Sequence, residues 1–346
     1  MPTRYATTVG HGSPSVFLFF QGGEMRKKTK GKRYSLEEFC LRTGLMAQEL
    51  WTVTANIKNH YFTWYKKKSD GQRRRINAPQ KRLKEIQHIL LEKISFCTSP
   101  QAHGGVKGRS IRTNALVHRR SKFMLTMDIK DAYPTVTRKM VYWFFRQMNT
   151  SAQLARILTK LTTLRGQLPQ GAPTSLAIFN ALLGADNLIG LDFWLERIRV
   201  GHRRLRYSRY VDDLTFSSGR KIPETAEKLI QKKLREAGFC VNPQKTRYAS
   251  LKNGALRVTG VNLIDGKTKV PPKEIRRFRG LIGRAIMDGS VSSDQVFGTI
   301  AYAMGIEKKI PNQLLKPFIK YLARTIDPCP RAISRQIKKQ LAGAKQ

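Results

Sequence analysis

The sequence has few acidic residues. Its 346 residues include 23 Asp and Glu against 65 Lys and Arg, which gives a formal net charge of +42. Basic tails on an unrelated globular domain are one explanation. However, basic residues occur along the whole chain, and residues 271–346 alone contain 15 Lys and Arg and 5 Asp and Glu. Because Lys and Arg that neutralise phosphates release condensed counterions, this charge predicts a polyanionic partner, first of all a nucleic acid.

Cysteine and histidine are also scarce. The four cysteines lie tens of residues apart without a C-x-x-C pair, and the six histidines form no H-E-x-x-H. This spacing argues against a structural zinc site and against a dense disulfide framework. The glycine-rich residues 104–110 lack the G-K-[ST] ending of a P-loop, so a motor ATPase is disfavoured.

Long apolar runs are absent too. No segment approaches the roughly 20 apolar residues that span a bilayer, and residues 16–20, the longest candidate, lack the flanks of a signal peptide. We therefore expect a soluble, cytoplasmic protein. With 40% apolar and 9% aromatic residues, the chain can bury ordinary cores, and its length suggests two or three modules.

The first 34 residues differ from the rest of the chain. Residues 1–24 carry little charge, and a basic run begins at Met25, which is an alternative to Met1 as the start of the protein. We expect residues 1–34 to be an extension that is partly disordered.

The remaining pattern predicts a mixture of helices and short strands. Ser35 has the character of an N-cap, because acidic residues follow it in the first turn. The other predicted elements are a hairpin over 61–79, a helix over 83–94, a buried strand over 122–128, a helix over 137–148, strands over 204–210 and 214–217, a helix over 224–237 that ends at Gly238, and helices from about 262 to the end, broken near 289, 311 and 327.

Three aspartates occupy positions that suggest catalysis. Asp212 and Asp213 lie between two predicted strands, and Asp128 ends a third. Neighbouring carboxylates repel one another unless cations bind between them, and Mg²⁺ is the cation that takes oxygen ligands and substrate phosphates. Two such ions can activate a hydroxyl and stabilise a leaving pyrophosphate. The alternative is a solvated Asp-Asp turn together with an Asp128 that caps the next helix.

The order of the surrounding segments decides between these interpretations. The sequences M-D-I-K-D-A-Y at 127–133, L-P-Q-G-A-P-T-S at 168–175 and Y-V-D-D at 210–213 resemble motifs A, B and C of reverse transcriptases. Two further segments, N-A-L-V-H at 114–118 and V-T-G at 258–260, narrow the resemblance to bacterial retron reverse transcriptases. R-R-I-N-A-P at 74–79 is similar to the fingers motif of the family, and the whole resemblance covers about residues 35–346.

The resemblance implies an α+β fold of the right-hand polymerase type. It would comprise N-terminal helices and fingers over 35–120, a palm with inserted fingers helices over 121–266 and a basic helical thumb over 267–346. Antiparallel sheet would form the palm.

The resemblance also assigns roles to individual residues. Asp128, Asp212 and Asp213 would be the catalytic carboxylates and would bind two Mg²⁺ ions together with the backbone carbonyl of Ile129. The dNTP would be bound by five residues. Arg74 would hold the triphosphate, Tyr133 would exclude a ribose 2′-OH, Gln170 and Gly171 would line the nascent base pair, and Lys245 would assist pyrophosphate departure or act as a simple counter-charge.

Contacts to RNA and to the template–primer form the last group. The resemblance places them at Asn114, His118, Val258, Thr259, Gly260, Arg276, Arg277, Arg279 and Arg284. For Asn114 and His118, a hydrogen-bonded structural pair is an equally good interpretation. The arginines suit structured RNA, which proteins recognise mainly through shape, phosphates and 2′-hydroxyls.

The resemblance implies an RNA-directed DNA polymerase that makes branched, RNA-linked single-stranded DNA (msDNA). Its partners would be dNTPs, its own structured non-coding RNA, the msDNA product and a separately encoded effector protein, and the complex would act in anti-phage defence. Priming would start from a 2′-OH of that RNA. Two alternatives stay open: another prokaryotic reverse transcriptase, such as a group II intron enzyme, and a non-catalytic RNA-binding protein on a polymerase fold.

Overall fold

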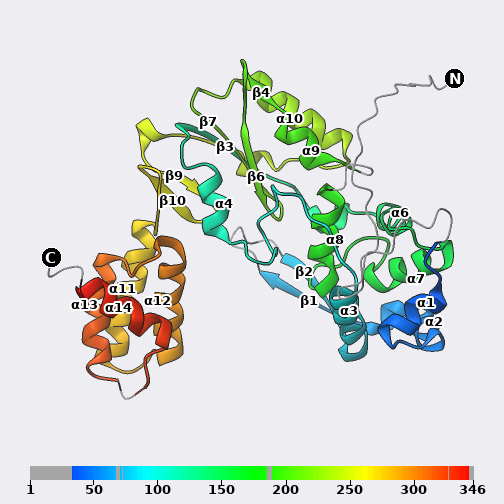
Figure 1. Cartoon of the computed structure of the whole chain (residues 1–346), viewed down its shortest axis with the longest axis horizontal. Coiled ribbons are helices and arrows are strands. Elements are labelled where there is room, and N and C mark those ends of the chain that lie inside the picture. Colours follow the sequence, from blue (N-terminus) through cyan, green and yellow to red (C-terminus); the bar gives the residue numbers. More distant parts are fainter. Residues whose placement is uncertain (1–32, 68–70, 72, 185–188, 326, 343–346) are drawn as a thin grey trace. The chain divides into compact units, whose positions relative to one another are not determined.

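The structure is a computed structural model that describes residues 33–67, 71, 73–184, 189–325 and 327–342 (Figure 1). The predictions for residues 1–32, including the choice of start, lie outside the described residues, as do residues 68–70 and 72 of the predicted hairpin over 61–79. The chain combines helices with antiparallel sheets, which confirms the predicted α+β class. None of the helices among the described residues is both long and apolar enough to cross a membrane.

Two compact units make up the chain. The first comprises the described parts of Met1–Pro100, Asp131–Leu195 and Lys233–Phe239, and the second those of Gln101–Lys130, Glu196–Lys232 and Cys240–Gln346.

The first unit contains a hairpin and a set of helices. As predicted, Ser35 caps the first helix: its hydroxyl accepts a hydrogen bond from the Glu38 amide while Glu38 bonds back to the Ser35 amide. Its elements are α1 (Leu36–Thr43), α2 (Ala47–Ala55), η1 (Ile57–His60), β1 (Tyr61–Lys67), β2 (Arg73–Pro79), α3 (Lys81–Lys93), α5 (Ala132–Thr135), α6 (Arg138–Gln147), α7 (Ala152–Thr162), α8 (Pro173–Gly184) and most of α9 (Leu191–Glu196).

The core of the first unit includes the apolar residues that recur at helical spacing in the sequence. Leu83, Ile86 and Leu90 lie on one face of α3 and are fully buried, where α3 packs against α8. Most of β1, by contrast, is exposed, including Phe62 and Trp64.

The second unit is built on a four-stranded antiparallel sheet with the order β6-β7-β3-β8. Alternation gives this sheet one apolar and one polar face, because successive side chains point to opposite sides. Leu125 of β3 opposite Phe216 of β7 belongs to the apolar face, and Thr126 opposite Thr215 to the polar one. The strands are β3 (Phe123–Asp128), β6 (Arg206–Tyr210), β7 (Asp213–Ser218) and β8 (Arg247–Ser250).

Around this sheet lie short elements and one long helix. Helix α10 ends before Gly238, whose φ of +84° fits the predicted C-cap. These elements are α4 (Ile111–Val117), β4 (Arg199–Val200), β5 (Arg203–Arg204), η2 (Pro243–Lys245), η3 (Leu251–Asn253) and all but the last turn of α10 (Glu224–Glu236), since Lys233–Glu236 belong to the first unit.

The prediction of continuous helix after residue 262 was wrong at its start. The chain first forms a three-stranded antiparallel meander of β9 (Leu256–Val258), β10 (Val261–Ile264) and β11 (Lys267–Lys269). Asp265 and Gly266 connect β10 to β11 with φ angles of +49° and +71°. Asp-Gly is a strong hairpin signal because both residues tolerate positive φ, and the prediction overlooked it.

Four helices follow the meander and pack around an apolar core (yellow to red in Figure 1), and all but α12 are rich in Lys and Arg. They are α11 (Pro272–Met287), α12 (Ser293–Glu307), α13 (Asn312–Leu322) and α14 (Arg331–Ala342). Phe297 of α12 stacks edge-on against Phe318 of α13, and both belong to this core.

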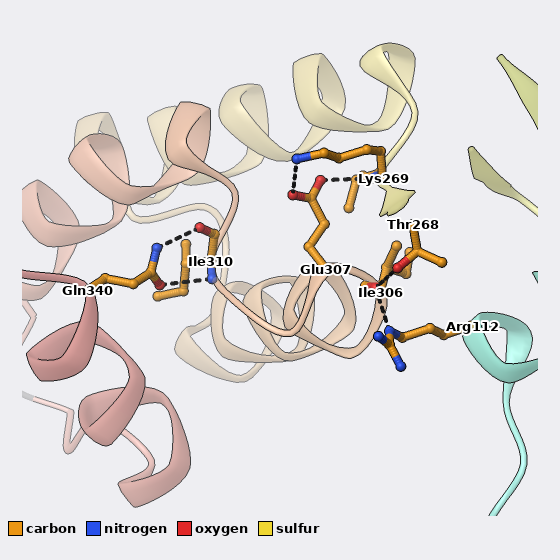
Figure 2. Close-up of polar contacts among 8 residues, drawn as sticks. Arg112, Thr268, Lys269, Ile306, Glu307, Ile310 and Gln340 are labelled. Atoms are coloured by element: carbon orange, nitrogen blue, oxygen red, sulfur yellow. Dashed lines mark hydrogen bonds and ion pairs between the residues drawn. The ribbon is translucent and has the colours of Figure 1, made fainter. Parts of the chain in front are cut away.

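Polar contacts hold the end of α12 against β11 and α4 (Figure 2). The Thr268 hydroxyl donates to the Ile306 carbonyl at 2.6 Å, and Arg112 Nε donates to the same carbonyl at 3.0 Å. Glu307 accepts from Lys269 Nζ at 3.2 Å and from the Val270 amide at 3.0 Å. Carbonyls at a helix end lack partners within the helix, so the two bonds to Ile306 satisfy a carbonyl that would otherwise be left unpaired.

Candidate active site

The three candidate aspartates lie at one end of the four-stranded sheet. Asp128, the last residue of β3, is directly opposite Asp213, the first residue of β7, and Asp213 is in turn opposite Tyr210 of β6. Residues directly opposite each other in antiparallel strands project to the same face. Asp212 is in the two-residue turn between Tyr210 and Asp213. The fold therefore brings the three carboxylates to the same end of the sheet, although 84 residues separate Asp128 from Asp212.

The turn that carries Asp212 contains backbone strain. Val211 has a φ of +62°, a left-handed conformation that is unfavourable for a β-branched residue. Such a conformation costs about 1–3 kcal/mol and persists only where the surroundings enforce it.

Residues 101–104 supply that support. The Arg209 amide donates to the Gln101 carbonyl at 2.9 Å, and the His103 amide donates to the Arg209 carbonyl at 2.8 Å, so this segment pairs with β6 just before the turn. Gly104 then lies directly against Val211: a Cβ atom on Gly104 would be 2.6 Å from Val211 Cγ2 and 2.8 Å from the Val211 backbone nitrogen. The sequence analysis gave Gly104 no role, because its neighbour lies more than one hundred residues away.

Backbone bonds also connect Asp128 and Ile129 to the site. The Ile129 amide donates to the Asp212 carbonyl at 3.0 Å, and the Asp128 carbonyl accepts from the Asn242 amide at 2.8 Å. In extended backbone the N–H and C=O of one residue point to the same side, so the Ile129 carbonyl is directed toward the turn that carries Asp212. This orientation suits the predicted role of the carbonyl as a metal ligand.

Lys245 is the cation of this cluster. Its ammonium donates to both carboxylate oxygens of Asp128, at 2.9 and 3.0 Å, and this bond raises the pKa of Lys245 above its ordinary value. Asn242 holds the short helix η2 that presents Lys245, because its side chain accepts from the Gln244 amide. The site therefore brings together three carboxylates and one ammonium group.

The pKa of Asp213 reflects its burial and the neighbouring carboxylates. The residue reaches solvent, yet partial desolvation of its carboxylate, together with the neighbouring charges of Asp212 and Asp128, raises its pKa to about 6 despite the lowering effect of Lys245. A divalent cation would relieve this repulsion, and carboxylate and carbonyl oxygens are the ligands that Mg²⁺ prefers. The donor set thus fits Mg²⁺, although no three His, Cys, Asp or Glu side chains of the described residues are arranged as a ready-made metal site.

The predicted dNTP residues other than Lys245 belong to the first unit. Gly171 has a φ of +118°, and a Cβ there would lie 3.0 Å from Ile76 Cγ2 and 3.1 Å from the Asn77 carbonyl oxygen. The neighbouring Gln170 carbonyl accepts from the Asn77 amide at 2.8 Å. This loop therefore packs directly on strand β2, and only glycine fits at position 171.

Arg74 and Tyr133 have different surroundings. Arg74 is exposed on β2 opposite Lys66, so its guanidinium is available to an anion. Tyr133 is half-buried in α5, with its ring centroid 5.6 Å from that of Phe179 in α8. Phe179 packs edge-on against Phe239, which fixes the position of the tyrosine ring.

Asn114 and His118 are fully buried, which does not support direct contact of their side chains with RNA. His118 Nδ1 is 2.6 Å from Ser217 Oγ of β7, and His118 Nε2 is 2.8 Å from Ser208 Oγ of β6. Asn114 Oδ1 accepts from Ser208 at 2.6 Å. Helix α4 is thus fastened to the polar face of the sheet that carries the aspartates, and the structural alternative describes this pair.

One set of proton positions satisfies the whole network. Ser208 donates to Asn114 and so accepts from a protonated Nε2 of His118, which leaves Nδ1 to accept from Ser217. Ser217 Oγ is also 2.7 Å from Ser121 Oγ, which can donate to it in this arrangement. The network thus fits a neutral His118 with its proton on Nε2.

Acid should therefore weaken the fold through His118. Burial, and then the charge of Arg206, lower the pKa of His118 from 6.5 to about 3. The unfolded chain binds a proton below pH 6.5 that the folded chain binds only near pH 3, so stability falls as the pH falls, by about 2 kcal/mol between pH 6.5 and 5. Denaturant unfolding of the wild type and of His118→Asn at pH 7.5, 6 and 5 tests this. We expect the variant to be less stable at pH 7.5 but to lose less on acidification, and identical pH slopes would contradict the assignment.

The V-T-G segment forms the β9–β10 turn. Val258 is fully buried, while Thr259 and Gly260 make the turn with φ angles of +44° and +83°. Asn114 Nδ2 donates to Thr259 Oγ1 at 3.3 Å, which connects the two retron-like segments directly. The sequence analysis identified both segments but did not predict this contact.

The four predicted arginines of α11 are all exposed. They occupy Arg276, Arg277, Arg279 and Arg284. Arg277 pairs with Glu274 at 2.8 Å and lies over the Phe278 ring. The helix buries Ile275, Phe278 and Ile282 in the core, so its basic side faces solvent.

Comparisons with known proteins agree with this geometry. Residues 65–275 match the model of the reverse transcriptase (RNA-dependent DNA polymerase) family. The chain is 27% identical to the Retron Ec86 reverse transcriptase of Escherichia coli, over 79% of this chain and 84% of that protein. It is 33% and 34% identical to the Retron Mx65 and Mx162 reverse transcriptases of Myxococcus xanthus, over 70% and 72% of this chain and 60% and 58% of those proteins.

The match covers more than half of the chain, and the chain belongs to the reverse transcriptase family. It is an RNA-directed DNA polymerase, and its helices and antiparallel sheets are those of the predicted α+β class. Within the family it is similar to retron reverse transcriptases, which confirms the resemblance drawn from its motifs. It spans about three fifths of the length of the two Myxococcus proteins.

Proposed function

We propose that this protein is the reverse transcriptase of a retron and that it synthesises msDNA on its own non-coding RNA by Mg²⁺-dependent nucleotidyl transfer. The observation that carries this proposal is the pairing of Asp128 with Asp213 across two strands, with Asp212 in the adjoining turn. The retron-like segments around Asn114 and Thr259 support the narrower assignment.

In this proposal Asp128, Asp212 and the Ile129 carbonyl hold two Mg²⁺ ions, with Asp213 as the third carboxylate. When bound, the ions supply activation of the primer hydroxyl and stabilisation of the leaving pyrophosphate. Lys245 leaves its bond with Asp128 and places its ammonium beside the departing phosphate, where a protonated group neutralises developing charge. The hydroxyl attacks the α-phosphate of the dNTP, and the bond to pyrophosphate breaks.

Other side chains select the nucleotide. The exposed Arg74 guanidinium binds triphosphate oxygens, which its planar fork matches. Gln170 and Gly171 line the nascent base pair, where the absence of a Cβ permits close approach. The proposal also keeps the fingers within residues 35–120, the palm with inserted fingers helices within 121–266, which contain the four-stranded sheet, and the thumb within 267–346, which contain α11–α14.

The Tyr133 ring is the proposed barrier to ribonucleotides. Replacing Tyr133 with Val removes the ring that would occupy the space of a 2′-OH, so we expect incorporation of rNTPs relative to dNTPs to rise by about ten- to a hundredfold, the range typical of steric discrimination. Single-nucleotide extension with matched rNTP and dNTP measures this ratio. Tyr142→Val, which replaces a half-buried tyrosine of α6, is the control, and an unchanged ratio in Tyr133→Val would contradict the role.

The RNA partner is proposed to contact the arginines of α11 and the Thr259–Gly260 turn. Both are accessible and lie on elements of one unit. The retron resemblance adds a separately encoded effector protein and a role in anti-phage defence, in the cytoplasm.

Expression of the protein together with the DNA that flanks its gene tests the retron assignment. The expected product is single-stranded DNA joined to RNA through a 2′,5′ bond, which a debranching enzyme releases. The Asp212→Asn variant should yield none. Linear cDNA primed only from a 3′-OH would favour a group II intron-like enzyme, and complete inactivity of the wild type would favour a non-catalytic RNA-binding protein.

A further inference from the structure

A pocket of about 410 Å³ lies in the first unit, outside the candidate active site. Residues of α6, α8 and α9 and the end of α10 line it. The buried Leu182 and the half-buried Met140 contribute apolar surface, and Trp143 and Trp194 also line it with half of each residue exposed, 50% and 51%. None of these residues has a role in the proposed reaction.

Two tryptophans on one open pocket require an explanation. Single exposed apolar side chains are common on soluble proteins, but adjoining exposed aromatic rings usually mark a binding surface. Both rings are also held in position: Trp143 packs edge-on against Tyr142, and Trp194 packs edge-on against Phe193. The pocket therefore presents preorganised aromatic surface to the solvent.

Basic side chains accompany the two rings. Lys139 and Lys233 both line the pocket, and Lys233 Nζ lies 5.0 Å from the centroid of the Trp194 ring. Arg138 and Arg235 are exposed neighbours in the same helices, and among the described residues of the lining only Glu236, which pairs with Lys233, is acidic. The described residues in and beside the pocket thus carry net positive charge.

The combination of residue types distinguishes between classes of partner. Tryptophan is enriched at protein–protein interfaces, but lysine is depleted there. Aromatic faces bordered by lysines are typical of surfaces that bind single-stranded nucleic acid, where bases stack on the rings and cations contact the phosphates. Charge complementarity therefore favours a nucleic acid strand over a protein.

We propose that this pocket, the Trp143–Trp194 pocket, binds unpaired nucleotides of a single-stranded nucleic acid. Bases stack on the two tryptophan rings, and Lys139 and Lys233 contact the adjoining phosphates. The binding needs no particular sequence, because every base has a π-face. The proposal does not depend on the retron assignment.

Photocrosslinking of the full-length protein tests the location. The probes are single-stranded DNA and RNA oligonucleotides that carry 5-bromouracil, and mass spectrometry identifies the crosslinked peptides. We expect crosslinks at Trp143 or Trp194 with one or both probes, and the comparison of the two probes shows which kind of strand the pocket prefers. Crosslinks elsewhere in the protein but at neither tryptophan would overturn the proposal.

Affinity measurements test the energetic role. A primer–template duplex with a series of single-stranded tails is compared with the same duplex without a tail, by fluorescence anisotropy. We expect the tail to lower the dissociation constant of the wild type. In the Trp143→Ala, Trp194→Ala double variant, this tail-dependent gain in affinity should be smaller by a factor of about 5 to 100. Trp51→Ala, an exposed tryptophan of α2, is the matched control.

Two controls separate this proposal from failure of the fold or of the polymerase. The double variant should bind the tail-less duplex and extend its primer as the wild type does. A Trp143→Phe, Trp194→Phe variant, which keeps an aromatic ring at both positions, should retain most of the tail-dependent gain in affinity. Equal tail dependence in the double variant and in Trp51→Ala would overturn the proposal, whichever other molecule the pocket binds.

Discussion

Replacing Asp212 with Asn should reduce primer extension by at least about 10³-fold while leaving the fold intact. Asparagine has the shape of aspartate but not its charge, and a carboxylate ligand of a catalytic ion contributes several kcal/mol to the transition state, where each 1.36 kcal/mol corresponds to about tenfold in rate. Steady-state extension of a DNA primer on an RNA template with Mg²⁺ measures the change.

The stability of Asp212→Asn should change in the opposite direction. The charge of Asp212 contributes to the raised pKa of Asp213, so its removal relieves repulsion within the folded protein. We expect the Tm of the Asp212→Asn variant to equal that of the wild type or to lie slightly above it. Asp265→Asn is the control, because Asp265 also lies in a tight hairpin turn, the one that connects β10 to β11. This variant should retain full activity. Loss of less than about tenfold in Asp212→Asn would contradict the assigned role.

Gly104→Ala should be the most damaging small substitution outside the aspartates. The new methyl group would lie 2.6 Å from Val211 Cγ2 and 2.8 Å from the Val211 backbone nitrogen. The valine side chain can rotate away, but the backbone atom can move only if the turn that carries Asp212 moves. Overpacking of this kind costs about 1–3 kcal/mol of stability. A displacement of about 1 Å at a catalytic group lowers the rate by about a hundredfold.

Primer extension and thermal unfolding of three variants test this prediction. Gly219→Ala is the matched control, since a Cβ there would contact nothing within 4 Å. The Gly104→Ala, Val211→Ala double variant removes one of the two clashes and should recover part of the activity. Wild-type activity in Gly104→Ala would show that residues 101–104 do not support the catalytic turn.

The sequence was most informative where chemistry and local pattern coincide. The strand ending at Asp128 and the pair of strands around Asp212 and Asp213 follow from alternation and turn residues, and the family motifs indicated that these aspartates converge. The N-cap at Ser35 and the end of α10 at Gly238 were likewise predicted, because caps are local interactions between neighbours in the chain.

Contacts between distant segments could not be predicted in the same way. Nothing in the residues around Gly104 indicates that Val211 will pack against it, and the two hydrogen bonds of His118 depend on serines in strands 90 and 99 residues away. The bond from Lys245 to Asp128 spans 117 residues. Such contacts arise from the tertiary fold, whereas the missed β10–β11 hairpin was an oversight of a local signal at Asp265 and Gly266.

Diffraction from crystals soaked with Mn²⁺ tests the central claim most directly. The crystals would contain the protein, a dideoxy-terminated primer on its template and the next dNTP, and anomalous scattering would locate the ions. The account predicts two ions bound by oxygens of Asp128 and Asp212, with the Ile129 carbonyl beside them and Lys245 no longer bonded to Asp128. A bound dNTP whose metal ions contact none of the three aspartates would contradict it.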